Sequence, residues 1–215
     1  MPVPKPTPVY RITDIDNLET CLRRGGLHAP NNWPKDGLPY RMAHNTEVQS
    51  SRGGKPITCG PGGVLHDYVP FYFGYLSVML LNLKTGRVKG YTAGQEPMIY
   101  LVSNCQAVAN SGADFVFSDG HGLAAYTGWF DDLADLDAVD WDLVYERYWS
   151  NTEADLDRQR RKQAEFLVHR FVDWGLIQDI AVIDAARKGE VEEILSRFPA
   201  TMHRPVVVRR DWYYW

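Results

Sequence analysis

The irregular order of short apolar segments constrains the fold of this chain more than any other feature of its sequence. Segments with the alternation and β-branched residues of strands are separated by helical spacings in some places and by turns in others; they lie at 9–13, 99–103, 114–120, 166–172, 177–183 and in the closing RPVVVRRDWYY (204–214). Strands and helices that do not alternate regularly are typical of an α+β fold rather than of a doubly wound parallel sheet.

Four segments have helical character. The clearest follows the first strand-like segment, where apolar residues recur on one face between 15 and 22. Asp14 or Asp16 can cap its start, and the pair Gly25 and Gly26 can end it. The other helical segments are 104–112, 141–149 and a last helix that Asp184 caps and that runs to about Phe198.

Three stretches resist a simple assignment. Residues 28–66 are rich in Pro, Gly, Asn and Ser, which predicts a long loop with a short helix near 43–51; a loop of this length inside a compact domain is usually functional or mobile. Residues 67–74 resemble a strand, but Pro70 restricts them to a sheet edge or to an irregular segment. The apolar run 76–83 is too short to assign to helix or strand.

Length and charge set further bounds. The chain has 215 residues without an internal repeat or a linker, so a single domain over residues 1–215 is expected. A net charge of −4 argues against wrapping long duplex DNA, but a local basic patch suffices to contact one strand. Three cysteines without a CxxC motif fit a reducing cytoplasm better than a disulfide scaffold. No run has the apolar length of a signal peptide or a membrane span, and a cytoplasmic location is expected.

Short motifs elsewhere do not carry a metal or phosphate site. GPGG (60–63) lacks the Lys-Ser/Thr of a phosphate-binding loop, SDGHG (118–122) has no second cluster of ligands at metal spacing, and DDLADLD (131–137) lacks the Gly and terminal Glu of a calcium loop. We therefore expect no metal, and the lack of a carboxylate metal cluster disfavours a nuclease.

Three longer segments stand out together: VYRITDIDNLETCLRRGGL (9–27), VLHDYVPFYFGYLSVML (64–80), and DWDLVYERYWSNTEADLDRQRRKQAEFLV (140–168), the last preceded by FSDGHGLAAYT (117–127). In this order and spacing they resemble the DarT toxins, a family of DNA ADP-ribosyltransferases. The resemblance covers about residues 9–170 and continues more loosely to the C-terminus.

The resemblance implies a compact ADP-ribosyltransferase fold like that of PARP enzymes, a split mixed β-sheet flanked by helices, with NAD in a cleft between the sheet halves. Glu165, in the motif AE-LV, would be the catalytic glutamate, and Arg52, in QSSRGGK, would be the catalytic arginine and a cofactor contact. The other cofactor contacts implied are Arg11, Ile12, Thr13, Asn17, Thr20 and His28. Relatives carry His where Arg11 stands, which leaves Arg11 to contact the NAD phosphates, to stack, or to shift substrate preference.

The chemistry suits these residue types. Breaking the bond between nicotinamide and ribose develops an oxocarbenium-like transition state, and a carboxylate beside the ribose stabilises its positive charge. The planar guanidinium of Arg52 matches phosphate oxygens. Because arginine is almost never neutral, it would stabilise a deprotonated acceptor base rather than remove its proton.

Basic and aromatic residues before Glu165 suit a single nucleic-acid strand. Arginine and lysine neutralise backbone phosphates, and aromatic rings stack on bases that must leave the stack to react. The predicted DNA contacts are Tyr126, Trp149, Arg158, Arg160, Arg161 and Lys162, with Trp129, Phe130 and Tyr148 also available for stacking. The segment 118–160 is expected to close over the substrate.

The resemblance also implies a biological setting. The target base would be thymidine or, as in some relatives, guanosine, in single-stranded DNA, and the enzyme would be the toxin of a toxin–antitoxin system whose partner is a DarG-like macrodomain antitoxin. A monomer is expected. Two alternatives stay open: an ADP-ribosyltransferase acting on RNA or protein, and a non-catalytic module that binds NAD or nucleic acid.

Overall fold

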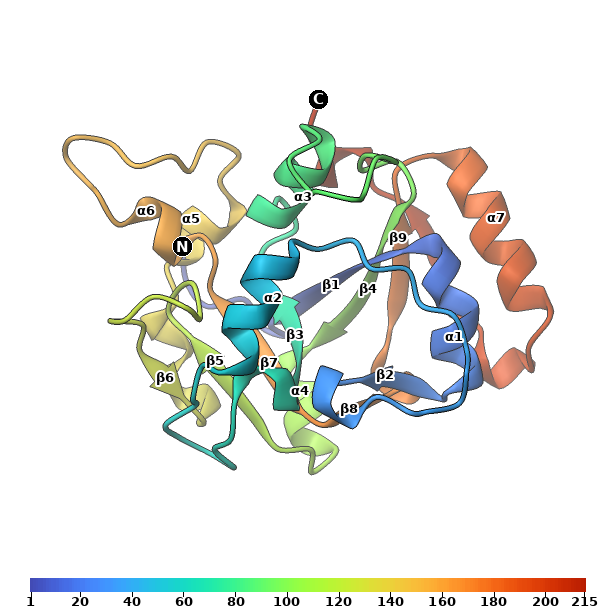
Figure 1. The fold of residues 1–215 in the computed structure, drawn as a ribbon, viewed down its shortest axis with the longest axis horizontal. Coiled ribbons are helices and arrows are strands. Elements are labelled where there is room, and N and C mark those ends of the chain that lie inside the picture. The colour runs from blue at the N-terminus through green and yellow to red at the C-terminus, as the bar shows by residue number, and fades with distance from the viewer.

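A computed structural model describes residues 1–215. Its main element is an eight-stranded mixed sheet with the strand order β10-β9-β4-β1-β3-β7-β5-β6, in which only β9 and β10 pair in parallel (Figure 1). The strands are β1 (Pro8–Asp14), β3 (Tyr68–Tyr72), β4 (Met98–Asn104), β5 (Phe115–Ser118), β6 (Trp129–Phe130), β7 (Glu165–His169), β9 (Asp179–Val182) and β10 (Val206–Val208). The α+β expectation is confirmed.

A two-stranded sheet of β2 (Gly26–His28) and β8 (Phe171–Asp173) lies beside the main sheet. The prediction of one strand over 166–172 was therefore wrong. Arg170 adopts a left-handed conformation with φ of 65°, which turns the chain sharply after β7 and sends it into the second sheet. The closing strand is also shorter than predicted, because a 3-10 turn at Arg210–Trp212 follows β10.

Seven α-helices connect and cover these strands: α1 (Leu18–Arg23), α2 (Thr46–Gly53), α3 (Val78–Lys84), α4 (Cys105–Asn110), α5 (Trp141–Tyr145), α6 (Arg158–Arg161) and α7 (Ala185–Ser196). The side chain of Asp184 caps α7 as predicted, by accepting the Arg187 N–H. Asp14 caps a 3-10 turn, Ile15–Asn17, that leads into α1. The run 76–83 is mostly helical. None of the helices combines the length and apolar character needed to cross a membrane.

The two larger buried clusters of the core lie on opposite faces of the sheet, and a third cluster of five residues joins Ile57, Leu65, Tyr68, Val116 and Leu167. On β4, Leu101 belongs to the larger buried cluster, and its neighbour Tyr100 belongs to the smaller one, because successive strand residues point to opposite faces. Residues of α1, α4 and α7 bury the larger cluster, and α3 with the C-terminal aromatic residues 212–214 buries the smaller. Figure 1 shows α1 and α7 together on one side of the molecule.

The prediction that Pro70 would restrict residues 67–74 to a sheet edge or to an irregular segment was wrong, because β3 is a regular interior strand between β1 and β7. The pairing explains how a proline is accommodated there. β3 pairs with β7 over its whole length, whereas its only register pair with β1 is Tyr10 with Tyr72. The Pro70 carbonyl points toward β1, where it accepts a hydrogen bond from Arg11 Nη1 at 3.1 Å. Pro70 therefore lies where β1 and β3 separate, and its missing N–H faces a gap instead of a ladder.

Candidate active site

A cleft of about 200 Å³ lies at this separation of β1 and β3. Its walls come from β1, α2, α3, β7 and an irregular segment, residues 29–45, which we call the strap. In Figure 1 the strap runs beside α1 before it returns to α2. The loop predicted over 28–66 thus supplies one whole wall, and the short helix expected near 43–51 is α2, which begins at Thr46.

Arg52 and Glu165 meet at the bottom of this cleft. Arg52 Nη1 lies 3.0 Å from both carboxylate oxygens of Glu165, and the two residues are only 6% and 4% exposed. The second terminal nitrogen of Arg52, Nη2, is buried without a hydrogen-bond partner. Because a buried donor without a partner costs free energy, it marks a group available to a ligand.

Local structure fixes both side chains. Arg52 lies in the last turn of α2, whose start is capped by Asn45. Glu165 is the first residue of β7, as predicted, and pairs with Tyr72 of β3. Its backbone N–H donates to Ser118 Oγ at 3.1 Å. The pair of Arg52 and Glu165 therefore joins one helix end to one strand end, 113 residues apart in sequence.

The structure brings most of the predicted cofactor residues to the same cleft. It is lined by Arg11, Ile12, Thr13, Asn17, His28 and Arg52. Thr20 does not line it, since its buried side chain donates to the Pro39 carbonyl at 2.8 Å. Thr20 therefore supports the strap from behind.

Asn17 also holds the strap. Its side-chain oxygen accepts the Arg41 N–H at 2.6 Å, and its amide donates to the Arg41 carbonyl at 2.9 Å. Arg24 adds a two-bond contact with Asp36, at 2.7 and 2.8 Å. These polar contacts attach the irregular strap to α1 and the turn before it.

The predicted DNA contacts lie outside the cleft, and they differ in availability. Tyr126 is 70% exposed. Trp149 is buried and donates to the Tyr214 hydroxyl at 3.0 Å, so its ring faces are not open to a base. Lys162 is buried as well, and its ammonium donates to the carbonyls of Leu143, Val144 and Glu146. Burial lowers the pKa of Lys162 to about 7, and this amine holds the end of α5 instead of facing solvent.

The three arginines of α6 all have protein partners. Arg158 donates to the Tyr148 carbonyl at 2.9 Å. Arg160 binds Asp119 and Asp157, and Arg161 binds Asp140 and Asp155. The basic run before Glu165 is therefore largely neutralised by acidic neighbours, which sequence order alone did not reveal.

His121 is a cleft residue that sequence analysis did not select. It lines the cavity together with Glu165 and Gln163, and burial lowers its pKa, which favours the neutral ring. Its motif, SDGHG, gave no metal site, and the signal that could have selected the histidine is its position inside FSDGHGLAAYT (117–127), one of the segments that resemble the DarT family.

Comparison with known proteins gives consistent matches over the whole chain. A family model described as "DarT: ssDNA thymidine ADP-ribosyltransferase, DarT" matches residues 10–214. A "DNA ADP-ribosyl transferase" of Thermus sp. (strain 2.9) is 42% identical over 211 residues, which cover 98% of both chains. Another, of Escherichia coli O127:H6, is 33% identical and covers 98% of this chain and 95% of its own.

Solved structures agree with these matches. A structure described as "Thermus sp. 2.9 DarT in complex with ADP-ribosylated ssDNA" has a TM-score of 0.93 and 41% identity, and it covers 100% of this chain and 99% of its own. The same Thermus protein in complex with NAD+ gives a TM-score of 0.88 with 40% identity, over 99% of this chain and 100% of its own.

Proposed function

Since this chain belongs to the DarT family of DNA ADP-ribosyltransferases, we propose that it transfers ADP-ribose from NAD to a base of single-stranded DNA, thymidine first, and releases nicotinamide. The observation that carries this proposal is the buried pair of Arg52 and Glu165, which leaves Arg52 Nη2 without a partner in the cleft. A carboxylate can stabilise positive charge on the reacting ribose, and a buried donor beside it can stabilise negative charge on the acceptor base.

The separation of β1 and β3 provides a place for the nicotinamide amide. Alternate residues of an antiparallel strand turn their backbone groups to the same neighbour. Ile15 donates to Pro97 on the β4 side, and Tyr10 pairs with Tyr72 of β3, so Ile12 faces the gap. Backbone N–H and C=O groups that face a cleft complement a carboxamide, which needs one acceptor and one donor. This supports Ile12 as a cofactor contact through its main chain.

Glu165 would act on the ribose of NAD. As the bond from ribose C1′ to the nicotinamide nitrogen breaks, its electron pair leaves with nicotinamide and positive charge develops at C1′. A carboxylate fixed by β7 can accept a hydrogen bond from the 2′-hydroxyl and stabilise that charge. The acceptor base gives its proton to water, and the resulting anionic base forms the new bond to C1′.

Arg52 would act on the acceptor base. Its Nη1 is held by Glu165, which orients the planar guanidinium and leaves Nη2 free. A cation that donates to a carbonyl oxygen of the base stabilises the anionic form that attacks C1′. Arg52 therefore lowers the energy of the deprotonated base without itself accepting a proton.

The biological role follows from the same activity. A base that carries ADP-ribose no longer pairs normally, so uncontrolled activity would block replication, as expected of a toxin. We propose a macrodomain antitoxin that removes the modification as the partner of this chain. Expression of the wild-type chain but not of Glu165→Ala should then arrest growth, and a co-expressed macrodomain hydrolase should restore it.

Intact-mass measurement of short single-stranded oligonucleotides incubated with NAD and the protein tests the enzymatic proposal. The expected result is a gain of one ADP-ribose on thymidine-containing strands, lost with Glu165→Ala. A gain of ADP-ribose on guanosine-containing strands alone would identify guanosine, instead of thymidine, as the target base. Consumption of NAD without any modified DNA would point to RNA or protein as acceptor, and no consumption of NAD would reject the enzyme.

A further inference from the structure

A loop formed by residues 119–128 lies against Glu165. The hydroxyl of Ser118 accepts the Glu165 N–H and donates to the Gly120 carbonyl at 2.7 Å. Gly122 is so close that a Cβ atom added to it would lie 3.2 Å from Glu165 Oε2. The position of this loop therefore determines the shape of the site around the glutamate.

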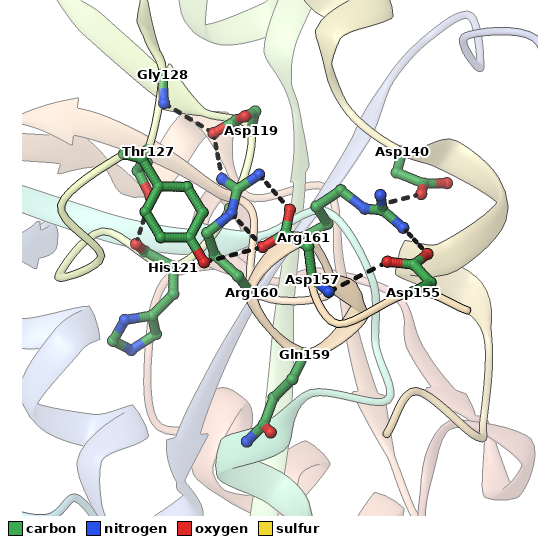
Figure 2. A network of polar contacts seen from close by, with 12 residues as sticks. Asp119, His121, Thr127, Gly128, Asp140, Asp155, Asp157, Gln159, Arg160 and Arg161 are labelled. Carbon is green, nitrogen blue, oxygen red and sulfur yellow. Dashed lines mark hydrogen bonds and ion pairs between the residues drawn. The ribbon is translucent and has the colours of Figure 1, made fainter. Parts of the chain in front are cut away.

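Arg160 connects this loop to the segment 155–161, as Figure 2 shows. Its Nη1 donates to Asp119 at 2.7 Å, and its Nε and Nη2 donate to the two oxygens of Asp157 at 2.8 Å each. Its backbone carbonyl accepts the His121 N–H at 2.9 Å. One residue thus contacts both the start of the loop and the histidine that lines the cleft.

Tyr126, at the other end of the loop, rests on the same guanidinium. The Arg160 carbon Cζ lies 5.0 Å from the centre of the Tyr126 ring, and the Tyr126 hydroxyl donates to Asp157 at 3.3 Å. The remaining surface of Tyr126 is open to solvent, where a base can stack. The guanidinium therefore fixes the orientation of the exposed ring.

The surroundings of Arg160 do not suit a contact with phosphate. Its side chain is only 11% exposed, and one guanidinium faces two carboxylates, so the local charge is negative. Gly120 packs directly on it, since a Cβ atom at that position would come within 2.4 Å of Arg160 Nη1. Space and charge both assign this side chain to the protein interior.

We propose that Arg160 is a positioning residue for the transfer reaction: it holds the loop 119–128 so that His121 lines the cleft with Glu165 and the exposed ring of Tyr126 keeps its orientation, and it does not bind the DNA backbone. The proposal rests on the proposed function for its consequence in catalysis. It assigns a different role to a residue whose place in the basic run predicted a DNA contact.

Asp119→Asn distinguishes the two roles, because a positioning role predicts slower transfer whereas a phosphate-binding role predicts tighter DNA binding. A positioning role requires the ion pair, so Arg160→Gln and Asp119→Asn should each reduce kcat for transfer by roughly 10- to 100-fold, the cost of misplacing reacting groups by about 1 Å. The KM for NAD should stay unchanged, and the double variant should be no worse than either single one. In a phosphate-binding role, Asp119→Asn would free Arg160 and strengthen DNA binding, which would overturn the proposal.

The salt dependence of oligonucleotide binding provides a second measurement. Losing one phosphate contact makes the negative slope of log K against log salt less steep, by about 0.7 on a single strand. Arg160→Gln should leave the wild-type slope unchanged. Arg187→Gln, which removes an ion pair on α7 away from the cleft, is the matched control for loss of one positive charge.

Hydrogen exchange separates this proposal from the proposed function, because it needs no substrate. Arg160→Gln and Gly120→Ala should both increase exchange in residues 119–128, the second by displacing the guanidinium without removing it. Unchanged exchange in both variants would reject the positioning role. If the wild-type protein modified no DNA but these exchange changes occurred, the proposed function would fail and the placement of Arg160 would stand.

Discussion

At the scale of single residues, the pair of Arg52 and Glu165 links activity to a cost in stability. Removing one member of a buried ion pair leaves an unpaired charge and typically costs about 3–5 kcal/mol, whereas replacing both members with apolar residues is often neutral. We expect Glu165→Leu to lower the free energy of unfolding by about this amount. Arg52→Met combined with Glu165→Leu should regain most of it.

Urea unfolding of the wild type, both single variants and the double variant measures this effect, and none of the three variants should transfer ADP-ribose. A double variant no more stable than Glu165→Leu would show that the pair is solvated in the folded protein. The comparison then separates loss of catalysis from loss of fold, because the most stable variant is expected to be inactive.

The basic run before Glu165 shows what sequence could not provide at this scale. Glu165 could be assigned because a motif and a strand start coincide. The run of charges that precedes it gives no direction for each side chain, since α6 is a single turn. Lys162 therefore looked like its neighbours, although its ammonium is buried among backbone carbonyls. The prediction for Trp149 was wrong for a different reason, because its partner Tyr214 lies 65 residues away in sequence.

At the scale of elements, Pro70 is expected to keep β1 and β3 apart. The next rung after Tyr10 and Tyr72 would join Ile12 to residue 70, and proline supplies no donor for it. Pro70→Val adds an N–H and a residue of high strand propensity at that point. We expect the two strands to pair further, which closes the cleft where Ile12 faces it and weakens NAD binding several-fold, a change of roughly 1 kcal/mol, like that of one added hydrogen bond.

Calorimetric titration with NAD measures this affinity, and slower exchange of the Ile12 amide in Pro70→Val would report the new rung directly. Pro56→Ala, at a bridge outside the main sheet, controls for the general effect of removing a proline. Unchanged NAD affinity together with an unchanged Ile12 amide would show that other contacts keep the strands apart.

Pro70 also illustrates which secondary-structure elements could be predicted from local sequence signals and which could not. Strand patterns, caps and glycine turns are local signals, and they located β1, β4, β5, β9 and α7 closely. Pro70 was predicted to lie at a sheet edge or in an irregular segment, because a residue without a backbone donor cannot take part in a full ladder of hydrogen bonds. Only the tertiary structure shows that an interior strand can meet this rule when its neighbour separates. Likewise, nothing in the run 166–172 indicated the left-handed turn at Arg170.

At the scale of the whole molecule, the two larger buried clusters share one continuous sheet. The strap and the loop 119–128, which border the cleft, are attached by polar contacts. A single domain over residues 1–215 stays a prediction, and independent unfolding of two parts would contradict it. Buried apolar side chains of strands such as β1, β4 and β7 stabilise the sheet. The strap and the loop 119–128 depend instead on Asp36 and Asp157. The parts of the molecule should therefore differ in their response to acid.

The direction of that response follows from the pKa shifts. The guanidinium of Arg24 holds the pKa of Asp36 well below its usual range, and the guanidinium of Arg160 lowers the pKa of Asp157. A carboxyl whose pKa is lower in the folded state stabilises that state above its unfolded pKa and loses this contribution as pH falls through the folded value. We expect the strap and the loop to loosen as the pH falls below about 4, the usual pKa of an aspartate, before the sheet unfolds. Hydrogen exchange at decreasing pH should show exchange rising first in residues 29–45 and 119–128, and Asp157→Asn should already show the increase in the loop at neutral pH. Loss of protection in the sheet and both segments at one pH would show instead that the cleft walls and the core unfold as one unit.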